Sequence, residues 1–71
     1  MAEQDMQADI GYIAGKIWRI LNTKGQCKIR ELPRALGAER ELVCMGLGWL
    51  AREDKLVFGK QGNHETVALK K

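Results

Sequence analysis

The spacing of apolar residues changes near residue 55, and this change limits the chain to a small set of folds. From residue 10 to 21 the apolar positions recur every three or four residues, which is the period of an amphipathic helix. Beyond residue 55 they form two short runs of β-forming residues. With 71 residues the chain has room for one domain. We therefore expect a single α+β domain over 1–71, with its core at about 9–69.

The first predicted helix covers residues 9–22. Asp5 or Asp9 can cap its start, because a side-chain oxygen satisfies free backbone N–H groups there. Gly25 ends it, since glycine readily takes the left-handed conformation that terminates helices. Its apolar stripe consists of Ile10, Ile13, Ala14, Ile17, Ile20 and Leu21.

Two more helices are predicted after a short link at 26–28, which can form only a small strand. The second helix begins near Arg30, because Pro33 is tolerated only in a first turn. Its inward residues are Leu32, Ala35 and Leu36. A break at 37–38 precedes the third helix, at 39–53. The predicted core face of that helix consists of Val43, Gly46, Leu47 and Leu50.

The last part of the chain predicts a hairpin. Residues 56–58 and 66–69 are expected to be strands, joined by a polar, glycine-bearing loop at 59–64. The complete order is helix, short strand, helix, turn, helix, hairpin. This is the order of a winged helix, with three helices, a helix-turn-helix, a short first strand and a small β-hairpin wing.

Several stretches resemble known winged-helix proteins. The stretch from Leu32 to Val57 resembles the helix-turn-helix of transcription regulators. The matching residues are Leu32, Ala35-Leu36-Gly37, Val43, Leu47, Leu50 and residues 52–57. Residues 14–18 and 48–55 resemble a small bacterial family of stand-alone, uncharacterised winged-helix proteins, and the resemblance extends from about 10 to 69. It implies the fold, and through the regulators it favours DNA binding, although a fold alone does not fix function.

The sequence contains no motif that indicates catalysis, cofactor binding, metal binding or insertion into a membrane. No apolar run is typical of a signal peptide or a membrane span, so we expect a cytoplasmic protein. Cys27 and Cys44 should then be reduced thiols. His64 is the single histidine, and no metal-binding spacing of Cys or His occurs. We expect neither an enzyme nor a bound metal or cofactor.

Positive charge is concentrated in two segments. The net charge is +3; residues 24–40 hold five cations against two acids, and residues 56–71 hold three cations against one acid. Mild basicity permits a polyanionic partner. The residues predicted to contact nucleic acid are Arg30, Arg34, Arg40, Arg52, Lys60, Gln61 and Asn63. The alternative is that these are solvated surface residues.

The outward face of the third helix is poorly suited to reading bases. A helix in the major groove reads base edges through polar side chains such as Arg and Asn. Here Met45 and Gly48 occupy the centre of that face, and Glu41 would repel phosphates. We therefore expect double-stranded DNA to be bound through phosphates rather than through base contacts from this helix.

The outward face of the third helix, and likewise exposed residues of the first helix, suit a protein interface, either in a homodimer or with another protein. Interfaces are enriched in aromatic residues and Met, and glycine allows close backbone approach. The predicted interface residues are Tyr12, Gly15, Trp18, Met45, Gly48 and Trp49. Either tryptophan could instead complete the core. For Trp49 the core is favoured over the interface. For Trp18 the core and the interface are equally favoured.

Overall fold

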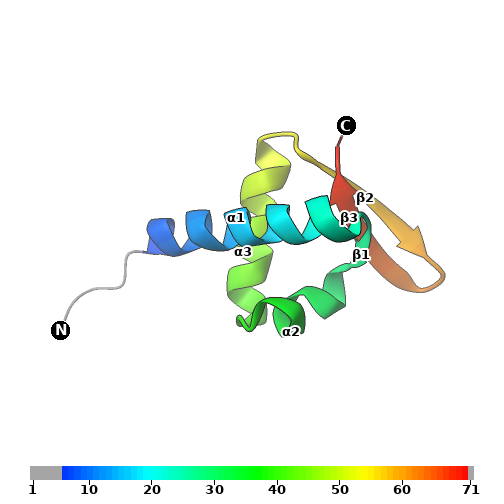
Figure 1. The fold of residues 1–71 in the computed structure, drawn as a ribbon, viewed down its shortest axis with the longest axis horizontal. Helices are drawn as coiled ribbons and strands as arrows, with labels where there is room; N and C mark the ends of the chain where they lie inside the picture. Colours follow the sequence, from blue (N-terminus) through cyan, green and yellow to red (C-terminus); the bar gives the residue numbers. More distant parts are fainter. Residues whose placement is uncertain (1–5, 71) are drawn as a thin grey trace.

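The computed structural model describes residues 6–70, and over this range the chain is a winged helix. Three α-helices and a three-stranded antiparallel sheet follow the predicted order (Figure 1). The elements are α1 (Met6–Lys24), β1 (Cys27–Lys28), the short 3-10 helix η1 (Ile29–Glu31), α2 (Leu32–Leu36), α3 (Arg40–Arg52), β2 (Leu56–Gln61) and β3 (His64–Leu69).

Helix α1 is longer than predicted at both ends. Asp9 lies within its first turn and not at the residue before it, while Asp5 falls outside the described residues. At the other end the Gly25 N–H donates to the Leu21 carbonyl at 2.8 Å. Gly25 has a φ of +84°, so it ends the helix in the predicted left-handed conformation.

The second helical segment begins as predicted but is less regular. Pro33 lies in the first turn of α2, where its missing N–H costs nothing. Leu32 and Leu36 are buried, as expected. Ala35 is exposed, contrary to the prediction, because it points about 100° away from its neighbour Leu36.

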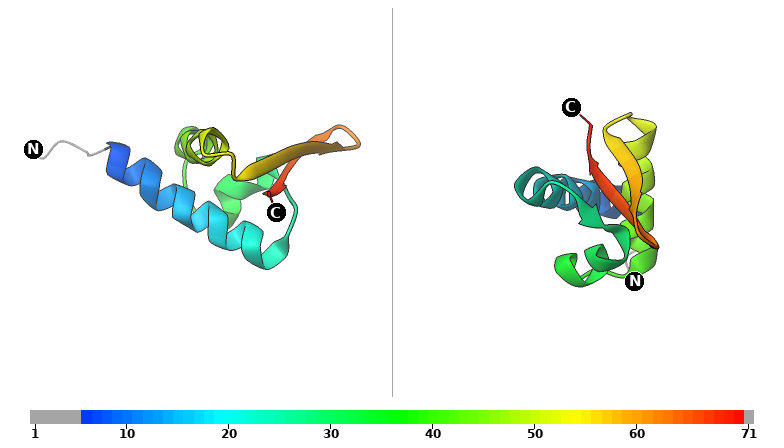
Figure 2. Two further views of the ribbon diagram at one scale, coloured as in Figure 1. Left: turned by 90° about the horizontal axis from the view of Figure 1, so that it is seen from above. Right: turned by 90° about the vertical axis from the view of Figure 1, so that its right-hand side faces the viewer.

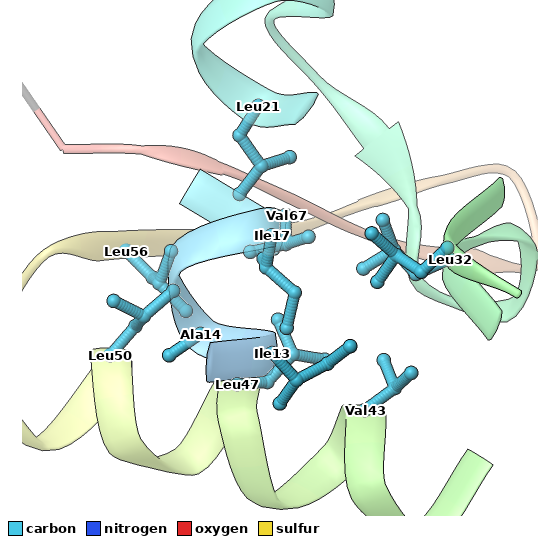
Figure 3. Close-up of a cluster of buried hydrophobic side chains, with 11 residues drawn as sticks. Ile13, Ala14, Ile17, Leu21, Leu32, Val43, Leu47, Leu50, Leu56 and Val67 are labelled. Carbon is cyan, nitrogen blue, oxygen red and sulfur yellow. The ribbon is translucent and has the colours of Figure 1, made fainter. Parts of the chain in front are cut away.

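The core forms where α1 crosses α3 (Figure 3). A Cβ atom on Gly46 would lie 2.6 Å from Ile13 Cγ2, so glycine allows this close crossing. Leu56 and Val67 add side chains from the sheet. The buried apolar residues are Ile13, Ala14, Ile17, Leu21, Leu32, Leu36, Val43, Leu47, Leu50, Leu56 and Val67. The predicted core face of α3 is confirmed, since Gly46 is buried as well.

The wing has longer strands and a shorter turn than predicted. β2 extends to Gln61 and β3 begins at His64, which leaves Gly62 and Asn63 as a two-residue turn. Gly62 has a φ of +63°, which suits the first position of such a hairpin turn. The expectation of a loop over 59–64 was wrong because residues 59–61 are exposed and show no alternation of apolar and polar side chains.

Strand β3 is central in the sheet, between β1 and β2. Val67 is paired with Cys27 on one side and with Phe58 on the other. The base of the hairpin therefore belongs to the core, while its tip projects away from the helices (Figure 2). β2 is an edge strand, so one side of the wing is left open.

Candidate nucleic-acid interface

Residues from η1, α3 and the wing surround one hollow with basic walls. Arg30 comes from η1, Arg40 is the first residue of α3, Lys60 comes from β2 and Asn63 from the turn. Four of the seven residues predicted to contact nucleic acid therefore meet around one space of about 400 Å³.

Sheet pairing brings these segments together. The antiparallel register of the wing places Gln61 opposite His64. β1 pairs with the other side of β3, which holds the adjoining residues of η1 beside the wing. Arg30 Nη1 lies 3.4 Å from His64 Nδ1. The guanidinium can only donate, so Nδ1 accepts and a neutral His64 carries its proton on Nε2. At this length and exposure the hydrogen bond is weak.

A second hollow continues the first. It shares Arg30 and His64 with it, and it is lined by Lys28, Arg30, Glu31, Arg34 and His64. Arg34 therefore adjoins the same surface as Arg40 and Lys60. We refer to both hollows together as the basic groove, whose basic and polar walls comprise Lys28, Arg30, Arg34, Arg40, Lys60, Asn63 and His64.

Acidic side chains also reach the basic groove. Glu65 lines the hollow that holds Lys60 and Arg40, and Glu31 lines the hollow that holds Arg34. Arginine and lysine together outnumber these two carboxylates. The groove therefore presents a net positive surface rich in N–H donors, which matches the requirements of phosphate oxygens.

Two predicted residues do not line the basic groove. Gln61 lines a neighbouring hollow, together with Lys24 and Cys27, and this hollow shares Lys28 and Glu31 with the groove. Arg52 is the last residue of α3 and lies beside Trp49 and Glu53. It is about 18 Å along the helix from the first residue of α3, which belongs to the basic groove.

The sequence analysis missed Lys28 and His64. It assigned His64 to a loop, whereas the structure places it at the start of β3, opposite Gln61. Hairpin register depends on turn length, so the overestimated loop concealed this position. Lys28 carried a usable signal, since it lies two residues before Arg30 in the basic segment 24–40.

The residues predicted for a protein interface are exposed on the two long helices. Met45 and Trp49 lie four positions apart on α3, and their exposed fractions are 41% and 42%. Trp18 on α1 is 41% exposed and Tyr12 is 70% exposed. The prediction that Trp49 lies in the core was wrong, since the buried face of α3 runs from Val43 to Leu50 and Trp49 lies outside it.

Tyr12 and Trp18 face different directions on α1. They are six positions apart, which separates them by about 120° around the helix. Lys16 Nζ lies 5.4 Å from the centroid of the Tyr12 ring, a cation–π contact within the helix. Gly15 and Gly48 are both exposed, and a Cβ atom at either would have no neighbour within 4 Å. Packing of the described residues therefore does not require glycine at these two positions.

Cys27 and Cys44 are free thiols, half-buried and exposed respectively. Burial raises the pKa of the Cys27 thiol, Lys24 opposes this rise and Glu31 adds to it. Within residues 6–70 no group of three or more His, Cys, Asp or Glu side chains could hold a metal ion. In the same range, every helix is too short or too polar to cross a membrane.

Known proteins resemble this chain over most of its length. Residues 1–69 match the family described as "Winged helix-turn-helix domain (DUF2582)". The "Uncharacterized protein MJ1608" of Methanocaldococcus jannaschii is 38% identical over 69 residues, which cover 94% of this chain and 99% of that protein. The solution NMR structure of protein BT2368 from Bacteroides thetaiotaomicron has a TM-score of 0.78 and 32% identity, covering 89% of this chain and 77% of that one.

Proposed function

The chain belongs to the winged helix-turn-helix family DUF2582, and from this premise we propose that it binds DNA through the phosphate backbone as a regulator of transcription. In this proposal it acts by binding alone and catalyses no reaction. The observation that carries the proposal is the basic groove, in which η1, α3 and the wing bring cations together from distant parts of the sequence.

The residues of α3 determine which contacts the proposal includes. Met45 and Gly48 are exposed on its outward face, and neither side chain donates a hydrogen bond to a base. Glu41 is exposed in the first turn and would repel a phosphate there. The proposal therefore assigns affinity to Arg30, Arg40 and the wing, and not to base readout by α3.

Binding to a short duplex of random sequence tests the proposal by fluorescence anisotropy. Affinity should fall steeply between about 50 mM and 200 mM salt, because phosphate contacts release counterions. Arg40→Gln or Lys60→Gln should weaken binding and reduce the salt slope by about 1 each. Glu65→Gln should have the opposite effect on affinity, since it removes a negative charge from the groove.

Arg52→Gln is the matched control. It removes the same charge from the same helix, but outside the basic groove. It should change affinity much less than Arg40→Gln does. Equal effects would show that only overall charge matters, and no binding even at low salt would end the proposal.

A second candidate function is a homodimer or protein contact through α3, and the exposure of Met45 and Trp49 supports it. Side chains four positions apart share one helix face, so these two residues form a local apolar surface. Sedimentation equilibrium at high concentration tests the homodimer. If it forms through this face, Met45→Lys should shift the protein to a monomer, while Tyr12→Lys on α1 should not. A wild-type protein that stays monomeric would rule out the homodimer.

A further inference from the structure

The wing carries an exposed aromatic ring next to the basic groove. Phe58 in β2 is 51% exposed, although its cross-strand partner Val67 is fully buried. The ring lines a hollow together with Ile29, Gly59, Lys60, Glu65 and Thr66. An aromatic side chain with half its surface in water is available for contact with a ligand.

The register of the hairpin fixes the direction of the ring. Alternate residues of a strand share a face, so Phe58 and Lys60 lie on the same side of β2. Val67 and Glu65 are their partners on that side. This face packs on the core at its base and borders the basic groove toward its tip. Within the described residues, half of the Phe58 side chain stays uncovered on this face.

The aromatic and the basic hollows adjoin each other. Ile29, Lys60 and Glu65 line both of them. Arg30 and Arg40 lie on the basic side of these shared residues, and Phe58 lies on the apolar side. One elongated ligand could therefore contact a flat ring and several cations at once.

We propose that this surface binds a single-stranded segment of nucleic acid, with an unpaired base stacked on Phe58 and the adjoining phosphates at Lys60, Arg30 and Arg40. The inference rests on the proposed function and specifies its ligand. Bases in a duplex are already stacked on one another, and exposing one costs a few kcal/mol. An unpaired base is free to stack on an aromatic ring, and this contact tolerates any sequence because every base has a π-face.

The chemistry of the groove supports a strand over other occupants. A single strand presents regularly spaced phosphates and flat apolar bases, which match the cations and the ring respectively. A polyanion without bases would leave the exposed ring of Phe58 unused. A duplex could use the cations through its phosphates, but its bases are already stacked on one another and would leave the ring of Phe58 unused.

Anisotropy titrations with a random single strand, an abasic strand of equal length and a matched duplex test the inference. The wild-type protein should bind the single strand more tightly than either of the others. Phe58→Leu keeps an apolar strand residue but loses the flat ring. It should weaken single-strand binding about 5- to 150-fold and leave abasic-strand binding unchanged. Phe58→Tyr should retain the wild-type affinity.

Val57→Ala is the control for a general effect on the strand. Val57 precedes Phe58, lies on the opposite face of the hairpin and has the same exposed fraction, 51%. The Val57→Ala variant should bind the single strand as tightly as the wild-type protein does. Circular dichroism of each variant would confirm that the fold is retained.

The possible results separate the inference from the proposed function. Duplex binding equal to or tighter than single-strand binding would overturn the inference but leave DNA binding intact. The inference would also be overturned, with DNA binding intact, if Phe58→Leu weakened duplex binding and single-strand binding equally. The ring would then act as a wedge in paired DNA. If no probe binds at low salt, both the inference and the proposed function fail.

Discussion

Gly46 and Gly48 lie two positions apart in α3, but their surroundings are opposite. A Cβ atom on Gly46 would approach Ile13 Cγ2 to 2.6 Å and Ile17 Cδ1 to 3.0 Å. Ile13 is 2% exposed and its branched Cβ restricts side-chain rotation, so it cannot move aside easily. A Cβ atom on Gly48 would meet nothing within 4 Å.

Alanine at these two positions should therefore change stability in opposite directions. Gly48→Ala should raise the free energy of unfolding by up to about 1 kcal/mol, because alanine favours the helix. Gly46→Ala gains the same helix propensity but should lose about 1–3 kcal/mol to overpacking, for a net decrease. Urea unfolding of both variants measures the difference. A Gly46→Ala protein with a free energy of unfolding equal to or above that of the wild type would contradict the close crossing of α1 and α3.

The two thiols should differ in reactivity. Burial raises the pKa of Cys27, so less of it is thiolate at neutral pH, while Cys44 is exposed. A thiol reagent should modify Cys44 first, and Cys44→Ser should leave one slowly reacting thiol. Cys27→Ser should leave one rapidly reacting thiol, and equal rates in the two variants would contradict this prediction.

The raised pKa of Cys27 also has a consequence for stability. The folded thiol holds its proton more tightly than the unfolded one, so its contribution is fully present below the unfolded pKa. That contribution should decline as pH rises from the unfolded pKa through the folded one. Cys27→Ser should lessen the loss of stability over this alkaline range.

Among the elements, the wing depends most on one backbone conformation. Gly62 has a φ of +63° in the two-residue turn, and a side chain there is strained by about 1–3 kcal/mol. Gly62→Ala should therefore lower the melting temperature and speed hydrogen exchange in β2 and β3. Asn63→Ala is the control, because its φ is not positive; it should lower DNA affinity and leave amide exchange in the strands nearly unchanged.

The helices were largely predictable because each carries a periodic apolar stripe. The spacing from Ile13 to Leu21 predicts one buried face of α1, and the structure buries it. The strands of the wing were harder to predict. Gly59, Lys60 and Gln61 are polar or small and do not show the alternation of apolar and polar residues that is typical of a strand. Strand pairing with β3, and not local propensity, makes them part of β2.

The candidate site was predictable only as a set of basic residues. Charge clustering in the sequence identified Arg30, Arg40 and Lys60, and the structure brings these three together. Arg52 lies outside those charge clusters and was predicted only from its place on the third helix, and the structure puts it at the opposite end of α3 from Arg40. The role inferred for Phe58 was also hidden, since an aromatic residue in a predicted strand is first expected in the core.

At the scale of the molecule, the basic groove should cost stability in the free protein. Several cations lie on one surface, and the net charge of +3 means that acids do not fully offset them. The ion pairs Lys55–Glu53 and Lys70–Asp54 lie elsewhere and are exposed, so each contributes about 0–1 kcal/mol. Repulsion within the groove should then dominate the dependence of stability on salt.

This balance predicts that salt stabilises the free protein. Raising ionic strength shortens the Debye length to about 8–10 Å, which screens repulsion among Arg30, Arg40 and Lys60. The melting temperature should rise by a few degrees, as expected for about 0.5–1 kcal/mol in a domain of this size. Lys60→Gln should raise the melting temperature at low salt and flatten its salt dependence, whereas Arg52→Gln should do neither. A melting temperature that falls with salt would show that attraction between opposite charges dominates the salt dependence. It would then count against a groove of mutually repelling cations that suits a polyanion.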